Sequence, residues 1–435
     1  MFDLKDHQGV WRLAGPIMIS NVSVPLLGAV DTAVMGHLPD PSYLGGVAIG
    51  ALIFSFLYWG FGFLKMGTGG LTAQALGAGD QDEVKSCLAR SLIIGIPLGV
   101  IIILLQVPLS FLSFYLVEAS QEVENLGGLY FETRIWGAPA TLANFALVGW
   151  FVGMQNTKMA LVHQLFLNSV NILLDLLFVI GFGWGVEGVA AATAIADILA
   201  FGFGLLLALA ILRRSKGQFL RHKIFNIEVM RRVFSLNFDI FIRTICLVSA
   251  FALFTAKGAA FGNILLASNA ILINFQTFMA HALDGLAHAA EAQGGKAFGA
   301  RDREAFKKAV RLSLFWGAIV AIGFTLVYFL TGKVIIYMLT DIDEIRDMAE
   351  KYLIWSVLMP VISVLAYVMD GIFLGATQGR TIRNAMSISF IIFIFAVYLF
   401  VPVMGNHGLW GALMLFMLVR GLTLLFCYKK LETSI

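Results

Sequence analysis

Six aspartates of this 435-residue chain lie within long apolar segments, where ionised side chains are rare. They are Asp31, Asp175, Asp197, Asp239, Asp284 and Asp370. A charged side chain at the centre of a bilayer costs about 2.5 to 3.5 kcal/mol on insertion scales, so acids retained there are functional candidates. Carboxylates grouped in a low dielectric cannot all ionise freely, and at least one is expected to hold a proton or a monovalent cation. The chemistry that this pattern indicates is the binding of small cations.

The composition requires lipid around most of the chain. Hydrophobic residues make up 59% of the sequence and charged residues 13%, against about 25% charged residues in ordinary globular proteins. Stretches of about 20 apolar residues bounded by charges or turns predict twelve transmembrane helices. Their expected ranges are 13–36, 44–66, 88–110, 126–152, 158–182, 186–212, 232–256, 263–287, 309–330, 350–374, 381–403 and 408–428. The expected fold class is an all-α polytopic membrane protein with no separate soluble domain.

The basic residues orient these spans. With both termini in the cytoplasm, 22 Lys and Arg belong to the inside segments and four to the outside segments. This bias is what the positive-inside rule expects, so the sequence predicts a multi-pass protein of a bacterial inner membrane with both ends cytoplasmic. No removed signal peptide is expected, because the first span lacks a small-residue cleavage site. The net charge of +3 is too small to indicate nucleic acid as a partner.

An internal repeat organises the spans into two halves. Three landmarks recur at a shift of about 220 residues: Leu76–Asp80 on Phe298–Asp302, Gly149-x-x-x-Gly153 on Gly371-x-x-x-Gly375, and Gly185-x-x-Gly188 on Gly405-x-x-Gly408. Two homologous six-helix lobes follow, residues 1–212 and 232–435, joined by a basic cytoplasmic linker of residues 213–231. Because each lobe has an even number of spans, the pseudo-two-fold axis must run along the membrane normal. The Gly-x-x-x-Gly pairs are interpreted as sites of close helix packing.

Polar residues of the first half are spaced so that they can converge. Asn168, Asn171 and Asp175 share one face of a predicted helix, and Thr193 and Asp197 share a face of the next. Carboxylate, amide and hydroxyl oxygens brought together in this way outline a site for a coupling ion.

Asp31 belongs to the outer half of the first predicted span. Pro25, six residues earlier, frees a backbone carbonyl and permits a bend in the helix that carries this acid, although a static kink fits the sequence equally well. At the positions equivalent to Asp31, Asp175 and Asp197 the second half has apolar residues, so the cluster belongs to the first half alone.

The acids of the second half lie toward the cytoplasmic ends of their spans. Asp239 and Arg243 form an i, i+4 pair, His281 and Asp284 form an i, i+3 pair, and Asp370 is the third acid. We interpret them as a self-satisfying polar network that helps to close a gate; a second proton or substrate site is the alternative.

Several motifs together make the chain resemble the multidrug and toxic compound extrusion (MATE) transporters. In the first half these are Pro25 to Asp31-Thr32-Ala33-x-Met35-Gly36-His37, Ala73-Gln74-Ala75-Leu76-Gly77-Ala78-Gly79-Asp80, Asn171-x-x-x-Asp175 and Gly185-Val186-Glu187-Gly188-Val189-Ala190-Ala191-Ala192-Thr193. The second-half motifs Asn237-x-Asp239-Ile240-x-x-Arg243 and Asp284-Gly285-Leu286-Ala287-x-Ala289-x-Glu291-Ala292 are similar to the DinF branch of that family.

The resemblance implies a V-shaped pair of lobes and the export of amphipathic, often cationic compounds by alternating access. It also implies cation coupling at Asp31, Asn171, Asp175 and Thr193, with Asp197 as a further member. Protons are the expected coupling ion, and Na⁺ at Asp31, Asn171, Asp175 and Thr193 is the alternative. The acids of the sodium-coupled branch have no match in the seventh span, and Lys296 stands where the family usually has Gln in the second-half loop. Candidates for the substrate cavity or the gate are Pro25, Met35, Asn168, Asp239, Arg243, His281, Asp284 and Asp370.

Other classes of function fit the sequence less well. A flippase for lipid-linked precursors is expected to line its cavity with cationic residues, and only Arg134, Arg243 and Arg420 lie well inside spans. An ion channel needs a continuous polar path, which acids confined to one half do not provide. Walker, His-Glu-x-x-His and Gly-x-Ser-x-Gly motifs are absent from the sequence, so no enzyme activity is expected. We expect a monomer in the bilayer that binds small organic molecules and needs no cofactor beyond the coupling ion.

Overall fold

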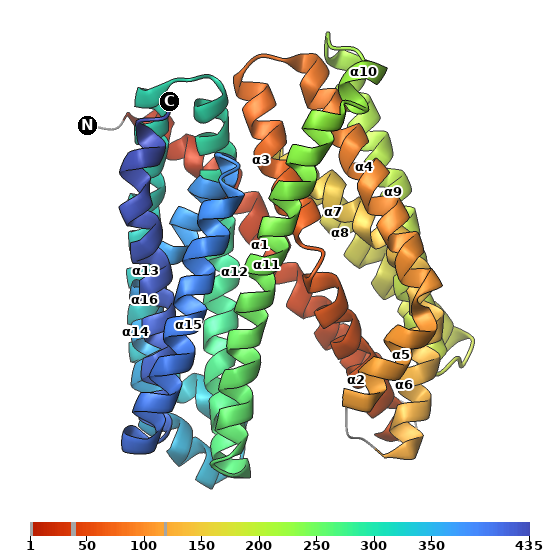
Figure 1. Cartoon of the computed structure of the whole chain (residues 1–435). Helices are drawn as coiled ribbons and strands as arrows, with labels where there is room; N and C mark the ends of the chain where they lie inside the picture. Colours follow the sequence, from red (N-terminus) through yellow and green to blue (C-terminus); the bar gives the residue numbers. More distant parts are fainter. Residues whose placement is uncertain (1–2, 36–40, 117–119) are drawn as a thin grey trace. The chain divides into compact units, whose positions relative to one another are not determined.

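The computed structural model describes residues 3–35, 41–116 and 120–435, apart from the side chains of residues 24–35, 41 and 116 (Figure 1). In this part of the chain every regular element is a helix, which confirms the predicted all-α class. The first helix, α1 (Leu4–Met35), begins almost at the start of the chain.

The helices gather into two compact units, each with its own core. The N-terminal unit contains residues 19–233, and the C-terminal unit contains residues 1–18 and 234–435. The N-terminal unit includes α2 (Pro41–Trp59), α3 (Phe63–Gly77), α4 (Gln81–Leu104), α5 (Gln106–Leu116), α6 (Gln121–Arg134), the 3-10 turn η1 (Ile135–Gly137), α7 (Ala138–Gly153), α8 (Thr157–Asp175), the π-helical turn η2 (Leu176–Gly181), α9 (Val186–Arg214) and α10 (Arg221–Ile224). The C-terminal unit includes most of α11 (Ile227–Ala259), with α12 (Asn263–Gly299), α13 (Arg303–Leu339), α14 (Asp343–Gly375), α15 (Gly379–Met404) and α16 (Asn406–Glu432).

Eleven helical segments within the described ranges are long and apolar enough to cross a membrane. They confirm a multi-pass membrane protein, while the count of twelve spans remains a prediction. Several segments are much longer than the roughly 20 residues that a bilayer core requires. Asn263–Gly299 and Arg303–Leu339 each have 37 residues, so helix continues beyond the apolar stretch expected from the sequence.

The internal repeat is visible as the same helix contact in both halves. A Cβ atom added to Gly149 on α7 would lie 2.2 Å from the carbonyl oxygen of Lys65 on α3. A Cβ atom added to Gly371 on α14 would lie 2.1 Å from the carbonyl oxygen of Ala287 on α12. Both members of the second pair stand 222 positions after those of the first. These glycines therefore allow two helix backbones to touch, which confirms the predicted repeat and its close packing.

The turns at equivalent positions of the two halves also have the same geometry, which is further evidence of the repeat. The turn before α4 has Gly79 in the left-handed region at φ 72°, and the turn before α13 has Arg301 there at φ 55°. The next residue caps the helix in each case, because Asp80 and Asp302 each accept a hydrogen bond of 2.9 Å from the backbone N–H three residues later. A side-chain oxygen at this position satisfies one of the free N–H groups of a helix start.

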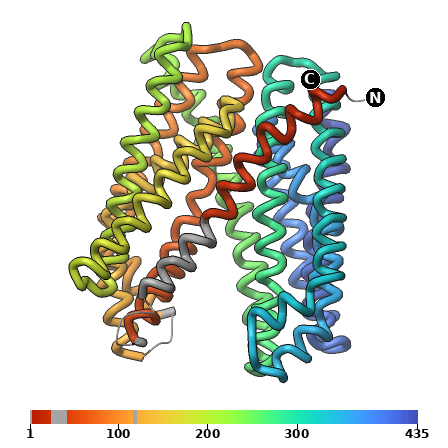
Figure 2. Tube along the Cα trace, turned by 180° about the vertical axis from the view of Figure 1, so that it is seen from behind, coloured from red at the N-terminus to blue at the C-terminus, as the bar shows by residue number. Residues whose placement is uncertain are grey.

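The beginning of α1 packs against the C-terminal unit (Figure 2). Lys308 Nζ on α13 lies 2.7 Å from Asp6 Oδ1, and Trp316 Nε1 lies 3.2 Å from His7 Nδ1. Further along α1, Met18 fills the space over Gly285 on α12. Residues 3–18 are therefore held by contacts with α12 and α13, and the remaining part of α1 belongs to the N-terminal unit.

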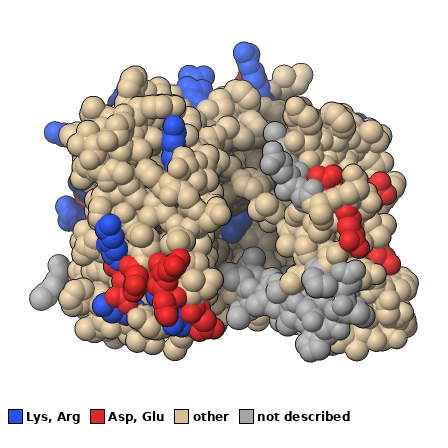
Figure 3. Space-filling view, turned by 90° about the horizontal axis from the view of Figure 1, so that it is seen from below, with Lys and Arg blue, Asp and Glu red and all other residues tan. Residues whose placement is uncertain are grey.

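An acidic turn joins α13 to α14, and acidic side chains gather on the corresponding face in Figure 3. Arg346 Nη2 lies 2.9 Å from Asp341 Oδ1, and Lys333 Nζ lies 2.6 Å from Glu350 Oε2. The start of α13 lies at the opposite end of this unit, where Arg303 pairs with Glu432 near the chain's end. The long helix α13 thus separates the acidic turn from the C-terminus.

Candidate functional site

A row of polar side chains on α8 points into the interior of the N-terminal unit. Asn168, Asn171 and Asp175 are all buried, and the last two have no exposed surface. Their spacing of three and four residues places them on one face, as the sequence predicts. Leucines at 173, 176 and 177 are exposed on the other side, where lipid would surround a membrane helix.

Asn171 lies between Asp175 on its own helix and Thr193 on α9. With its amide nitrogen toward Asp175, Asn171 donates to Asp175 Oδ2 at 3.0 Å, and its oxygen accepts from Thr193 Oγ1 at 3.1 Å. With the amide reversed, its nitrogen donates to Thr193 Oγ1 at 3.1 Å and its oxygen faces Asp175. The structure therefore brings together three of the four residues predicted for the principal coupling site.

The first orientation of the amide suits an ionised Asp175, which can only accept hydrogen bonds. The reversed orientation suits a protonated Asp175, because a carboxylic acid can donate to the amide oxygen. Thr193 tolerates either arrangement, since its hydroxyl group both donates and accepts. The hydrogen bonds that link Asp175 to Thr193 through Asn171 can thus form whether Asp175 is ionised or protonated.

The same row of side chains is tied to α1. Asn168 Nδ2 donates to Ser23 Oγ at 2.9 Å, and Gln164 Nε2 donates to Asn168 Oδ1 at 2.9 Å. The predicted site residues Pro25, Asp31 and Met35 lie farther along α1, outside the described side chains. Ser23 is a contact that sequence analysis missed, and a serine eight residues before an intramembrane acid is too common a signal to have found it.

The helix geometry changes directly after Asp175. The α-helix α8 ends at this acid, and the π-helical turn η2 continues to Gly181. Such π turns are rare and occur frequently at functional sites, because the wider turn frees backbone groups from the regular hydrogen-bond pattern.

Asp197 belongs to a second hydrogen-bonded group, one turn along α9 from Thr193. Thr141 Oγ1 on α7 donates to Asp197 Oδ2 at 2.7 Å, and Asn144 Nδ2 donates to the Asp197 backbone carbonyl at 3.0 Å. Asn144 Oδ1 also lies 3.2 Å from His163 Nε2 on α8. All four side chains are buried. Thr193 and Asp197 share one face of α9, but Thr193 contacts α8 and Asp197 contacts α7.

The sequence alone did not identify Thr141 and Asn144 as partners of Asp197, or His163 as the partner of Asn144. Thr141 and Asn144 are spaced three residues apart within a span, which is the same helical signal that located Asn168 and Asn171. Because neither residue is ionisable, a search that started from intramembrane acids passed over them.

In the C-terminal unit Asp370 is the centre of a buried charge cluster. Its Oδ2 accepts from Arg243 on α11 and from Arg420 on α16, and all three residues are at most 7% exposed. Asp239 pairs instead with Arg383 of α15, at 2.7 Å between Oδ1 and Nη1. The predicted pairing of Asp239 with Arg243 is therefore wrong, because neighbouring helices supply each of these charges with a closer opposite charge.

Two further pairs of ionisable residues lie on α12. His281 and Asp284 are both half-buried, and Asp284 interacts electrostatically with Arg420 and Tyr367. One turn later His288 Nδ1 lies 2.9 Å from Glu291 Oε2, and Glu291 is only 1% exposed. His288 and Glu291 were not among the candidate site residues named from the sequence, although their i, i+3 spacing is a readable signal.

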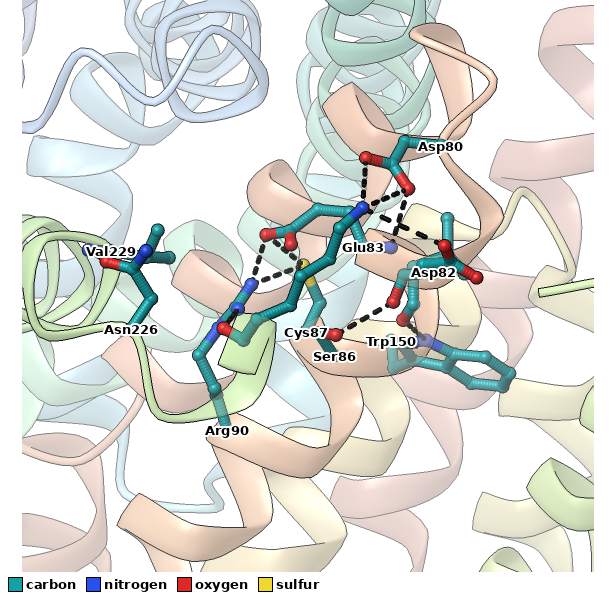
Figure 4. Close-up of polar contacts among 11 residues, drawn as sticks. Asp80, Asp82, Glu83, Ser86, Cys87, Arg90, Trp150, Asn226 and Val229 are labelled. Carbon is teal, nitrogen blue, oxygen red and sulfur yellow. Dashed lines mark hydrogen bonds and ion pairs between the residues drawn. The ribbon is translucent and has the colours of Figure 1, made fainter. Parts of the chain in front are cut away.

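The start of α4 carries a separate ionic cluster, of which Asp80 and Lys223 lie outside the membrane-spanning segments (Figure 4). Lys223 Nζ of α10 lies 2.8 Å from Asp80 Oδ2, and Arg90 pairs with Glu83 while donating to the Lys223 carbonyl at 2.9 Å. Burial raises the pKa of the Asp80 carboxyl, but the hydrogen bond from Lys223 and those from backbone N–H groups bring the pKa below its usual range. The hydrogen bond to Asp80 correspondingly raises the pKa of Lys223. Part of the basic linker is thus fastened to the N-terminal unit.

Comparisons with known proteins agree with this architecture. The family model MatE matches residues 16–177 and 240–399. Over 431 residues the chain is 40% identical to DNA damage-inducible protein F of Escherichia coli K12, an alignment that covers 99% of this chain and 93% of that protein. Multidrug export protein MepA of Staphylococcus saprophyticus is 21% identical over 383 residues, covering 86% of this chain and 82% of that protein. The fold is shared with a MOP superfamily transporter from Pyrococcus furiosus, at a TM-score of 0.88 and 18% identity, with 98% of this chain and 96% of that one covered.

Two repeated helical halves with buried polar groups inside membrane spans are the architecture of a secondary transporter. The chain belongs to the MATE family of transporters, in the branch of the Escherichia coli DinF protein.

Proposed function

We propose that the chain is a secondary active exporter of amphipathic, often cationic organic compounds, driven by protons that move inward through the N-terminal unit. The observation that carries this proposal is the buried contact of Asn171 with Asp175 and Thr193. A carboxyl group without exposed surface, inside a membrane span, costs too much to be retained without a purpose.

Asp31 is the proposed second carboxyl group of this site. Ser23 on α1 is tied to Asn168 on α8. Asp31 follows Ser23 by eight residues, and Asp175 follows Asn168 by seven, which correspond to about 12 Å and about 10 Å of helix. Since both helices run outward in the predicted topology, these rises favour similar depths for the two acids.

Proton binding supplies the coupling in this proposal. A proton that enters the site neutralises Asp175 and turns the Asn171 amide, whereas the substrate binds preferentially to the other protonation state. Exchange follows because each ligand favours a different conformation, and neither can shift the equilibrium by more than its difference in affinity. Asp197, with Thr141 and Asn144, is proposed as an extension of the proton path along α9.

Sodium is the second candidate ion. Carboxylate, amide and hydroxyl oxygens at Asp31, Asn171, Asp175 and Thr193 could surround a monovalent cation. We favour the proton, because in the orientation that satisfies both of its neighbours Asn171 presents its amide nitrogen to Asp175, and an amide nitrogen is not a cation ligand. The exporter is proposed to act as a monomer in the inner membrane, with both termini cytoplasmic and no prosthetic group.

The arginines inside the spans support the exporter over a flippase for lipid-linked precursors. Arg243 and Arg420 both pair with Asp370, and Arg134 donates to Tyr130 Oη at 2.8 Å while its guanidinium stacks 4.8 Å over Phe54. Cations engaged in this way are not available to hold the phosphates of a lipid carrier. An ion channel remains the alternative from a different class.

The test is export of a fluorescent organic cation from proteoliposomes, with a pH gradient and a sodium gradient imposed separately. Wild type is compared with Asp175→Asn and Asp31→Asn, and Asp341→Asn in the exposed acidic turn is the matched control. We expect export under the pH gradient alone, lost in the first two variants and unchanged in the control.

Export that requires sodium would reassign the site to sodium coupling. Export under neither gradient would contradict the exporter and favour the flippase, and steady single-channel currents would favour the channel. Wild-type export in both Asp175→Asn and Asp31→Asn would remove the first-half acids from the mechanism.

A further inference from the structure

A groove of about 820 Å³ lies between α5 and α6 of the N-terminal unit, apart from the coupling site. The helix α4 ends at Leu104 and α5 begins at Gln106, so a break in the third predicted span sets α5 beside α6. Polar and aromatic side chains both line the groove: Gln106, Ser110, Thr133, Glu132, Phe111 and Trp136. Its volume lies within the range of about 300 to 1,000 Å³ that is typical of pockets for drug-sized ligands.

Glu132 is the only acid among the described residues that line this groove. No described residue forms a hydrogen bond or ion pair with it, and its side chain is exposed. Arg134 is only two residues away, but positions two apart on a helix point in different directions. Arg134 turns inward, where Tyr130 and Phe54 engage its guanidinium. Within the described part of the chain, the carboxylate of Glu132 therefore has no neighbouring cation.

The lack of a neighbouring cation among the described residues is unusual for an acid at the position of Glu132. It lies eleven residues after Gln121, the first residue of α6, which is about 16 Å along the helix. It also lies within the membrane-spanning segment Gln121–Gly153. An acid on such a segment is costly in lipid unless something satisfies its charge.

The surroundings of Glu132 show what kind of group would satisfy its charge. Phe111 and Trp136 are 73% and 61% exposed at the groove, although both are large aromatic side chains. Aromatic faces attract a cation and also bind apolar surface. A carboxylate beside two rings therefore complements a molecule that has one positive charge and an apolar body.

We propose that this groove is a second binding site, which takes an amphipathic organic monocation with its charge on Glu132 and its apolar part on Phe111 and Trp136. Ser110 and Gln106 supply the polar side of the groove. The site is separate from Asn171, Asp175 and Thr193, and it requires no change of protonation there. Only the identification of the ligand as a transported compound rests on the proposed function.

The proposal is tested by protection of a single cysteine in the groove. In full-length protein with Cys87, Cys246 and Cys427 replaced by Ser, the variant Ser110→Cys is labelled with a methanethiosulfonate reagent while tetraphenylphosphonium is added. We expect tetraphenylphosphonium to slow labelling. In the Glu132→Gln variant the concentration for half-protection should rise about tenfold, the loss that corresponds to one charge contact. Glu132→Asp should recover most of the protection.

Glu122→Gln is the matched control, because Glu122 is an exposed acid on the same helix but does not line the groove. It should leave protection unchanged. Equal half-protection in wild type and Glu132→Gln would overturn the proposal, as would equal protection by uncharged triphenylphosphine oxide or a Ser110→Cys thiol that no reagent reaches. Export by the wild-type protein is measured on the same preparation. A protein that exports without groove protection would contradict the groove alone, and protection without export would contradict the proposed function alone.

Discussion

The side-chain amide of Asn171 lies 3.0 Å from Asp175 Oδ2, and its other end lies 3.1 Å from Thr193 Oγ1. Asn171 and Asp175 are both fully buried at this contact. An amide has a donor at one end and an acceptor at the other, so rotation by half a turn exchanges the two without moving the helices. Asn171 can therefore form a hydrogen bond with an ionised or with a protonated Asp175.

We expect Asn171→Leu to abolish coupled export, because a leucine can neither donate to an ionised Asp175 nor accept from a protonated one. Asn171→Gln should retain part of the activity. The measurement is the pH dependence of export by proteoliposomes with each variant. Asn269→Leu is the comparison, since Asn269 is a buried asparagine of the C-terminal unit that pairs with Asn406 and not with Asp175. If Asn171→Leu exports with the wild-type pH profile, the amide has no part in proton binding.

Asp370 stabilises the C-terminal unit by pairing with two buried arginines. We expect Asp370→Asn to destabilise the protein far more than Asp239→Asn, because it leaves Arg243 and Arg420 buried without the carboxylate that pairs with both. Removal of one partner of a buried ion pair costs about 3 to 5 kcal/mol. Asp239 faces Arg383, whose side chain is 32% exposed and can reach solvent.

The measurement is thermal unfolding of the purified variants in detergent, with expression level recorded. Replacement of all three residues, with Asp370→Leu, Arg243→Met and Arg420→Met, should restore much of the stability. Similar melting temperatures for Asp370→Asn and Asp239→Asn would contradict the central role of Asp370.

The sequence was sufficient to predict the fold class and the repeat, because both depend on patterns that can be recognised in the sequence itself. Long apolar runs predict helices, and the Gly149 and Gly371 motifs predict the contacts that the structure contains. Helical spacing also located Asn168, Asn171 and Asp175 on one face.

Partners on other helices were beyond the reach of sequence spacing. Arg243 stands four residues after Asp239, yet its charge is satisfied by Asp370, 127 positions away. Spacing within one helix cannot rank such distant partners, because the result depends on how the helices pack. The same limit concealed Thr141 as the partner of Asp197 and the groove beside Glu132.

Close packing at the repeated glycines leads to a prediction about folding. We expect Gly371→Val to abolish stable expression, because its Cβ would lie 2.1 Å from the carbonyl oxygen of Ala287 and two backbones would have to separate. Overpacking of a core typically costs about 1 to 3 kcal/mol, and backbone clashes exceed that range. Gly149→Val should have the same effect through Lys65.

Gly323→Ala is the control, because a Cβ atom there would meet no described atom within 4 Å. The readout is the yield of monodisperse protein on size-exclusion chromatography. Normal yields of Gly371→Val and Gly149→Val would show that the helices can part at these positions without loss of the fold.

The linker is expected to remain fastened to α4 across the whole neutral range of pH. The folded-state pKa of Asp80 is lowered, so its contribution is present above its unfolded pKa of about 3.9 and is lost as pH falls through the folded value. The folded-state pKa of Lys223 is raised, so its contribution is present below about 10.4 and is lost as pH rises through the folded value. The pair is partly exposed and contributes little by itself, but Gln218 N–H also donates to Asp82 Oδ1 at 2.6 Å.

Chymotrypsin cleavage at Phe219 and Phe225 measures how firmly this part of the linker is held. We expect Asp80→Asn to accelerate cleavage at neutral pH, because the carboxylate that binds Lys223 is lost. Asp302→Asn is the matched control: Asp302 caps α13 in the same way, and its hydrogen bond is to Ala305 with no contact to the linker. If both variants accelerate cleavage equally, general destabilisation of the protein explains the effect; if only Asp80→Asn does, the ion pair with Lys223 holds the linker against the N-terminal unit.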